Sequence, residues 1–246
     1  MLPLAPVSIP SDRLDELQSS RSTAQLSSEA AMTCFDIVLK TEASLHPFGE
    51  PDEYISEYTG IVRAEGEDGV PRRVGKVHAW RIRAEDAAAN GESLFEVCDA
   101  HSHEMHVVHT LLYEPNGYEL KEELVGEFGV LGFDCLVFDY VILHPKWRGL
   151  KLGLLAVRKT VDLVGVGCGL VACDISPLRH EAHSLLKVPP AWLPQLSTVE
   201  EKKAAVRKLR RHFRRLGFRR IGKTPYFGLS MTRQAPSASE LLRPEA

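Results

Sequence analysis

The feature that most constrains the fold is a strand, a short loop and a helix in residues 137–164. The strand is rich in apolar and β-branched residues up to Leu143, and Pro145 ends it. Apolar side chains then recur at helical spacing from Leu154 to Val164. A second apolar strand follows in residues 169–175, and two strands joined through a helix lie parallel in one sheet. The sequence therefore predicts an α/β domain built around this unit.

The loop before this helix has the chemistry of an anion site. Backbone N–H groups at a helix N-terminus lack intrahelical partners and lie at the positive end of the helix dipole. Gly149 and Gly153 would let a phosphate approach the backbone, and Arg148 adds a positive charge. A pyrophosphate is the expected ligand. Many α/β proteins carry such a loop and bind nothing there, so a purely structural loop is the alternative.

Two blocks of sequence resemble the GNAT superfamily of N-acetyltransferases. Residues 148–153, RGLKLG, with the strand and the His144-Pro145 pair before them, are similar to the Arg/Gln-x-x-Gly-x-Gly/Ala loop of that superfamily. Residues 212–222, HFRRLGFRRIG, and 225–231, PYFGLSM, are similar to its late helix, its LGF turn and its two closing strands. The blocks come in the expected order and cover roughly residues 133–232.

The resemblance implies a mixed β-sheet of the GNAT acyltransferase type, with flanking helices and a splayed central strand pair. Acetyl-CoA would be the co-substrate. Its pantetheine arm would bind backbone groups of the strand that ends at Leu143, and its pyrophosphate would bind amides of the loop. The residues expected at the cofactor are Val141, Ile142, Leu143, Arg148, Gly149, Leu150, Lys151, Leu152, Gly153 and Leu154. Lys151 departs from the pattern, because a glycine or another small residue is usual there.

The resemblance also implies direct attack of a primary amine on the thioester, whose carbonyl would be polarised by an N–H near Ile142. Asp139 is a candidate base, and a hydrogen-bonded strand carboxylate is its alternative role. The tyrosine that many members use as the acid is replaced by Phe213, which cannot donate a proton. Tyr226 is the candidate acid, with Cys173, His212 or a water as alternatives. A non-catalytic acyl-CoA-binding or regulatory protein is therefore the rival function.

Length and composition favour one main domain. The chain has 246 residues, of which 44% are hydrophobic and 26% charged, as in ordinary globular proteins. We expect a poorly ordered N-terminal segment at residues 1–31, a GNAT-like domain at 32–232 and a flexible tail at 233–246. Within the domain we expect a helical insertion at about 85–127 and a loop insertion at about 176–197.

The helical insertion carries one apolar stripe through residues 92–112, which predicts a single long amphipathic helix. It falls between the third and fourth strands, whereas the family has its early helices after the first strand. The acceptor amine therefore cannot be carried over and stays unknown, whether small molecule or protein. Four histidines share this helix, His101, His103, His106 and His109, but no HExxH pattern accompanies them, and we expect no metal.

The late helix is strongly basic. A capping box at Ser197 or Thr198 predicts its start, and Gly217 its end. Residues 202–223 contain eleven Lys and Arg and no acidic residue, while the whole chain has a formal net charge of -3. A solvated face is the first explanation, phosphate binding the second. Nucleic acid is the least favoured partner, because no aromatic stacking series accompanies the charge.

Targeting signals are absent from the sequence pattern. No apolar run approaches the length of a membrane span, and no signal peptide pattern precedes the domain. The five cysteines lack the short paired spacing of a zinc site and suit a reducing compartment. We therefore predict a cytoplasmic protein without a membrane partner. Whether two chains form a homodimer stays open.

Overall fold

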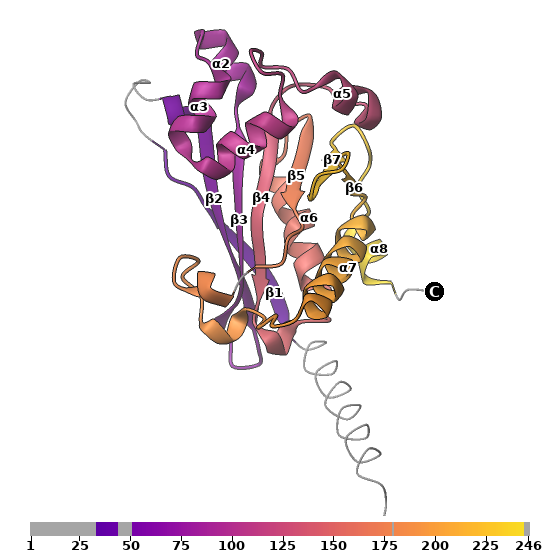
Figure 1. Ribbon diagram of the computed structural model, residues 1–246. Helices are drawn as coiled ribbons and strands as arrows, with labels where there is room; N and C mark the ends of the chain where they lie inside the picture. Colours follow the sequence, from indigo (N-terminus) through magenta and orange to yellow (C-terminus); the bar gives the residue numbers. More distant parts are fainter. Residues whose placement is uncertain (1–32, 44–50, 179, 244–246) are drawn as a thin grey trace, which may run out of the picture.

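The computed structural model describes residues 33–43, 51–178 and 180–243 (Figure 1). In these residues the chain is an α/β protein with one mixed sheet of seven strands in the order β1-β2-β3-β4-β5-β7-β6. The predicted α/β class is therefore confirmed. The expected N-terminal segment, residues 1–31, lies outside the described residues.

Seven strands make up the sheet in the described residues. They are β1 (Cys34–Lys40), β2 (Ile55–Glu65), β3 (Pro71–Ile82), β4 (Cys135–Leu143), β5 (Leu170–Asp174), β6 (Arg219–Arg220) and β7 (Tyr226–Ser230). Strands β1 to β4 pair antiparallel in sequence order, and β4 pairs with β5 in parallel. Strand β7 runs antiparallel to both β5 and β6. The parallel pair around the central helix is confirmed.

Helices cover both faces of the sheet. The helices are α2 (Ala84–Asn90), α3 (Leu94–His101), α4 (His103–Leu112), α5 (Glu122–Phe128), α6 (Leu152–Val164), α7 (Val199–Arg215) and α8 (Ala238–Leu242), and short 3-10 turns are η1 (Pro51–Tyr54), η2 (Pro145–Trp147), η3 (His180–His183) and η4 (Pro190–Trp192). Helices α2 to α5 join β3 to β4, where the sequence predicts a helical insertion (Figure 1). Helix α6 joins β4 to β5.

Alternation along β3 separates the two faces. Trp80 and Ile82 pack into a core cluster with α2 to α5, whereas Val77 and Ala79 pack into a second cluster with α6 and α7. A third, smaller cluster lies under the loop insertion at residues 176–197. It contains Tyr140, Ile142, Val188, Trp192 and Leu193. The first face is therefore covered by helices at one end and by the loop insertion at the other.

Strands β4 and β5 are partners over only part of their length. Their pairing runs from Cys135 with Leu170 to Phe138 with Cys173, and β5 ends one residue later (Figure 1). Residues 140–143 of β4 keep β3 as a partner, but residues 139–143 have no strand partner on the other side among the described residues. The sheet is therefore open along one edge of β4, at the end of β4 that leads to α6.

A β-bulge lies at the point where β4 separates from β5. Ala79 pairs with Phe138 and His78 with Tyr140, so Asp139 is the extra residue. Because Asp139 is an extra residue, the alternation of side chains between the two faces of the sheet shifts by one position along β4. Before it, Val137 packs into the first cluster; after it, the even-numbered Tyr140 lies on that same face.

The helical insertion differs from the prediction at one point. The apolar stripe of residues 92–112 is present, with buried Cys98, Met105 and Leu112, but the helix is broken at Ser102. Ser102 has an extended backbone, and its hydroxyl accepts a hydrogen bond from the N–H of Met105, which makes it the N-cap of α4. The prediction of one long helix is wrong because the Ser102 hydroxyl accepts a backbone hydrogen bond that a carbonyl would accept in a continuous helix, and a new helix starts there.

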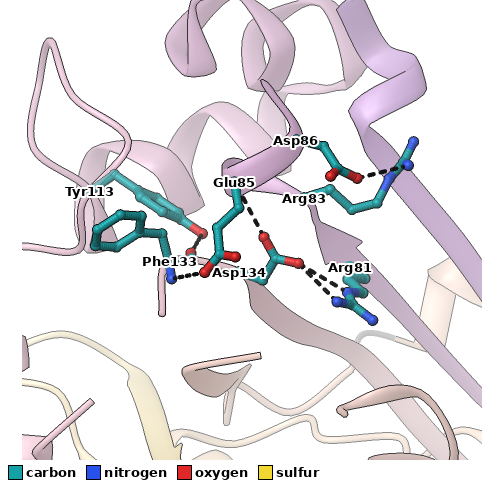
Figure 2. Close-up of polar contacts among 7 residues, drawn as sticks. All are labelled: Arg81, Arg83, Glu85, Asp86, Tyr113, Phe133 and Asp134. Carbon is teal, nitrogen blue, oxygen red and sulfur yellow. Dashed lines mark hydrogen bonds and ion pairs between the residues drawn. The ribbon is translucent and has the colours of Figure 1, made fainter. Parts of the chain in front are cut away.

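Figure 2 shows how the insertion is fixed to the start of β4. Asp134 accepts two hydrogen bonds from the guanidinium of Arg81, of which the Nη2 bond is 2.9 Å long, and one from the N–H of Glu85. The Glu85 carboxylate accepts a hydrogen bond from the N–H of Phe133, and the Tyr113 hydroxyl donates to the Phe133 carbonyl. Asp134 thereby ties β3 and the start of α2 to the residue before β4, while Glu85 and Tyr113 tie α2 and the end of α4 to Phe133.

The ends of the basic helix are as predicted. Thr198 and Glu201 form the capping box of α7, and Gly217 follows it with a φ of 93°. The segment after β7 differs from the expected flexible tail, because α8 lies within it and Leu241 is buried in the second cluster. Among the described residues, no helix combines the length and the apolar character that crossing a membrane requires.

Candidate functional site

The open edge of β4 presents backbone groups of two predicted cofactor residues. The N–H of His144 donates to the carbonyl of Val74 in β3. Since backbone groups alternate along a strand, Ile142 also turns its N–H toward β3, and Val141 and Leu143 turn theirs to the open edge. Of the residues around Ile142, where the polarising N–H is expected, Val141 and Leu143 are therefore the ones whose N–H groups face the open edge.

The N-terminus of α6 lies just beyond this edge in the chain. Leu152, Gly153 and Leu154 form its first turn, which has no side-chain cap and no acidic residue. The other helices of at least eight residues, α3, α4 and α7, begin with a Ser or Thr hydroxyl that accepts a backbone N–H. The first amides of α6 therefore lack a capping side chain among the described residues, as an anion site at this position requires.

The loop keeps the backbone that its pattern implies, even where the residue type departs. Gly149 has a φ of 84°, and Lys151 has a φ of 62°. Both lie in the left-handed region, which glycine adopts without strain and lysine does not. Lys151, at the position where the family has a small residue, therefore reproduces the glycine conformation at an energetic cost.

The Lys151 side chain points to the C-terminal segment. Its ammonium donates to the carbonyl oxygens of Leu242, at 2.8 Å, and Arg243. A guanidinium nitrogen of Arg215, from α7, donates to the carbonyl of Leu241 at 2.8 Å. The C-terminal end of α8 is therefore held against the α6 loop by two cations, one from each flanking helix.

Arg148 is engaged away from the loop amides. Its Nε donates to the carbonyl of Leu143 at 3.1 Å, and its Nη2 donates to the carbonyl of Trp192. Burial lowers the pKa of Arg148. Its guanidinium thus joins the end of β4 to the loop insertion, and the predicted role beside a pyrophosphate is not the one this geometry gives it.

A histidine between two carboxylates lies on the first face of the sheet, beside the open edge. His78 Nδ1 is 3.0 Å from Asp139 Oδ2, and His78 Nε2 is 2.7 Å from Glu57 Oε1. The three residues come from β3, β4 and β2. The His78 side chain is 9% exposed, while those of Asp139 and Glu57 are 32% and 61% exposed. The carboxylates are therefore open to solvent and the imidazole is not.

The two carboxylates control the charge of His78. Burial alone would lower the pKa of His78, but the hydrogen bonds with Asp139 and Glu57 and the charges of both carboxylates raise it above its ordinary 6.5. A neutral imidazole has only one N–H, so it can satisfy one carboxylate and must turn a lone pair toward the other. This group of three residues, named here the Glu57–His78–Asp139 triad, therefore accepts a proton at a pH above the raised pKa of His78 and holds one below it.

Aromatic rings fix the imidazole in place. The Tyr140 ring stacks on it with centroids 5.2 Å apart, and Trp80 meets it edge-on at 4.8 Å. The Lys76 ammonium lies over the Tyr140 ring, 5.4 Å from its centroid, and donates a hydrogen bond to the carbonyl of Leu186. The triad therefore lies between the helical insertion and the loop insertion.

Tyr226, the predicted acid, lies on the same face. It comes from β7, opposite Asp174 at the end of β5, and it is 9% exposed. Burial first, and then the charges of Asp174, Asp139 and Glu104, raise its pKa to about 12. Its phenol therefore stays protonated at neutral pH and can donate.

The other candidate acids are less suitable. Phe213 is buried in the second cluster, edge-on to Phe218 at 5.3 Å. Cys173 is buried in the same cluster, and burial raises its pKa well above 9.0. Burial first, and then the nearby Arg215 and Lys208, lower the pKa of His212 to about 4. A Cβ added at Gly153 would lie 3.3 Å from His212 Nε2, so this neutral ring fills the space beside the α6 loop.

Sequence reasoning found Asp139 and Tyr226 but missed Glu57 and His78. The signal for His78 was its place in a run of apolar strand residues, Val77 to Trp80, where a polar side chain needs a partner. The partner could not be named, because contacts between strands depend on the register and on the bulge.

The described part of the chain has no group of three or more His, Cys, Asp or Glu placed to hold a metal ion together. The histidines of α3 and α4 have other surroundings. His106 Nδ1 lies 2.9 Å from Asp99, and His109 is buried against Tyr113. Comparisons of the chain with protein-family models, with curated proteins and with solved structures found no match.

Proposed function

We propose that this protein is an acetyl-CoA-dependent N-acyltransferase with a GNAT-type fold. The observation that carries the proposal is the separation of β4 from β5 after Phe138 and Cys173. It leaves the backbone edge of Val141 and Leu143 without a strand partner, as the pantetheine arm of CoA requires in the family that the sequence resembles. An extended chain can bind such an edge in the way that a further strand does.

Two further observations support the proposal. The α6 N-terminus, whose amides lack a capping side chain, follows this edge within nine residues, so one ligand with an extended arm and a pyrophosphate can contact both. The Glu57–His78–Asp139 triad and the phenol of Tyr226 lie on the face beside the edge. The proposal therefore brings a cofactor site, a proton acceptor and a proton donor together at one place in the fold.

The chemistry follows from these positions. A neutral amine attacks the thioester carbon, a C–N bond forms, and the C–S bond breaks. The backbone N–H groups at the open edge stabilise the developing oxyanion. Asp139 takes the proton that the amine nitrogen loses, and His78 shares it through the 3.0 Å hydrogen bond. Tyr226 donates a proton to the thiolate of CoA, which leaves as the thiol.

The test starts with thermal unfolding in the presence of acetyl-CoA. A ligand at about a hundred times its Kd stabilises the folded state by roughly 2.7 kcal/mol, a shift of a few degrees for a chain of this size. We expect this shift for the wild type and for Gly149→Asn, and a smaller one for Gly149→Asp. Asn and Asp have nearly the same shape and tolerate the left-handed backbone of Gly149, so only the charge differs.

Turnover is measured next, as release of free CoA thiol with a panel of primary amines. The proposal requires amine-dependent release that falls in Asp139→Asn. An absence of any thermal shift with acetyl-CoA in the wild type would contradict the whole proposal, and equal shifts in Gly149→Asp and Gly149→Asn would contradict the pyrophosphate site.

A non-catalytic acyl-CoA-binding protein is the second candidate function. Phe213 favours it, since it fills a core position where many members of the resembled family have a tyrosine acid. The contact of Lys151 with the end of α8 favours it as well, because it makes the position of the loop depend on the C-terminal segment. In that case acetyl-CoA stabilises the protein but no amine releases CoA.

A further inference from the structure

We propose that the exposed face of α7 binds the phosphate backbone of a nucleic acid. The proposal is independent of the acyltransferase site, and it starts from a row of four cations. Lys203, Arg207, Arg211 and Arg214 follow one another along α7 at spacings of four, four and three residues, and all four are exposed. Side chains at these spacings share one face of a helix. We call these four residues the basic row.

Two more exposed cations, Lys202 and Lys208, flank the basic row. None of the six side chains has a hydrogen bond or an ion pair with a residue that the structure describes. Five arginines elsewhere in the described residues form ion pairs with aspartates. They are Arg63, Arg72, Arg81, Arg83 and Arg158. The six cations of α7 therefore keep their charge without a carboxylate partner among the described residues.

The charge is also segregated within the sequence. Residues 202–223 hold 11 of the 30 Lys and Arg and no acidic residue, so the other 19 Lys and Arg are outnumbered by all 33 Asp and Glu. Like charges at helical spacing destabilise a helix that has no partner. An anionic partner would remove this repulsion, and it would be drawn to this face of an otherwise acidic protein.

The surroundings of the row distinguish a nucleic acid from a membrane. A helix that lies on a membrane inserts an apolar face between the lipids. In α7 that face is already used, because Val206, Leu209 and Phe213 pack into the second core cluster. Along residues 202–214 no aromatic or large aliphatic residue is exposed, and the exposed residues other than Ala204 are all Lys or Arg. Such a surface suits phosphates spaced along a strand and reads no base sequence.

The experiment measures the binding of fluorescent oligonucleotides by anisotropy, as a function of salt. The probes are a mixed-sequence single strand of RNA and a DNA duplex, each of roughly 20 nucleotides per strand, in about 50 to 300 mM KCl. The test variant is Arg207→Gln/Arg211→Gln/Arg214→Gln. The control, Lys40→Gln/Arg63→Gln/Arg72→Gln, removes the same charge from strands β1 to β3.

For the wild type we expect affinity that falls with salt, with a slope of log K against log salt of about -3 to -4 for the single strand, since each neutralised phosphate contributes about -0.7. The α7 variant should lose about 2 from the magnitude of this slope and at least tenfold in affinity at low salt, for every sequence tested. The control variant should keep the wild-type slope.

Several outcomes would overturn the proposal. One is an absence of binding to either probe at low salt, and another is an equal loss in the two variants. Binding to phosphatidylserine vesicles but to neither oligonucleotide would assign the row to a membrane. A wild type that binds no oligonucleotide, together with an α7 variant that loses its thermal shift with acetyl-CoA, would assign the row to the cofactor. Circular dichroism of each variant establishes that it is folded.

Discussion

His78 Nδ1 lies 3.0 Å from the carboxylate of Asp139, and Asp139 is the bulged residue at which β4 parts from β5. The bulge thus does two things at one place. It ends the pairing geometry that would close the sheet, and it gives β4 an extra residue whose carboxylate reaches the imidazole on β3. The proton acceptor of the proposed reaction is therefore coupled to the opening in which the cofactor would lie.

The first prediction concerns the pH dependence of stability. The pKa of His78 is raised in the folded state, so the folded state binds this proton more tightly than the unfolded chain does. The resulting stabilisation is fully present below about pH 6.5 and is lost as the pH rises through the folded-state pKa. Urea unfolding over this range should show the decline in the wild type, and His78→Asn should lack it.

The same protonation should control turnover with the opposite sign, because the triad accepts a proton only after His78 has lost its own. The rate should rise with pH through the midpoint at which stability falls. Glu57→Gln should move both midpoints to lower pH, since it removes one of the two carboxylates that raise the pKa. Ionisation of the amine is common to all variants. Midpoints that move independently would sink the coupling.

The second prediction concerns Tyr226. Tyr226→Phe removes only the proposed donor, so kcat should fall about a hundredfold while the thermal shift with acetyl-CoA stays as in the wild type. The matched control is Tyr113→Phe, which removes a buried hydroxyl that donates to the Phe133 carbonyl, a contact between the end of α4 and the residues just before β4 (Figure 2). It should lower stability by about 1 kcal/mol and leave kcat unchanged. Equal effects of the two changes on kcat would remove Tyr226 from the mechanism.

Local patterns predicted most of the elements. Apolar periodicity gave β4, α6 and β5 with their parallel order, and the capping box of Thr198 with Glu201 gave the start of α7. These features depend on neighbours within four residues, which sequence spacing records directly. The break at Ser102 was missed because the spacing of the apolar residues is the same whether the serine continues one helix or its hydroxyl caps the next one.

The contacts that make up the site were beyond prediction. His78 meets Asp139 across 61 residues and Glu57 across 21, through two strand registers and one bulge. Lys151 meets the end of α8 across about 90 residues. A register shift of one residue would move each strand side chain to the other face, so no pattern within a single strand can name these partners.

The third prediction separates strain from contact at Lys151. Lys151→Gly and Lys151→Ala both remove the ammonium that binds the carbonyls of Leu242 and Arg243. Only glycine also relieves the left-handed backbone, which costs a residue with a Cβ about 1 kcal/mol. Urea unfolding should therefore find the Gly variant more stable than the Ala variant by about that amount. Equal stabilities would mean that the loop relaxes out of this conformation.

The fourth prediction concerns Asp134, which ties the helical insertion to the sheet (Figure 2). Asp134→Ala should lower the free energy of unfolding by about 2 to 4 kcal/mol, because it leaves the guanidinium of Arg81 and the N–H of Glu85 without their acceptor in a largely buried place. Asp162→Ala is the control. It breaks the more exposed ion pair with Arg158 within α6 and should cost less than about 1 kcal/mol. Chemical unfolding of both variants gives the comparison. If the two costs are alike, the insertion is held by its apolar core cluster alone, and the position of α3 and α4 beside the triad does not depend on Asp134.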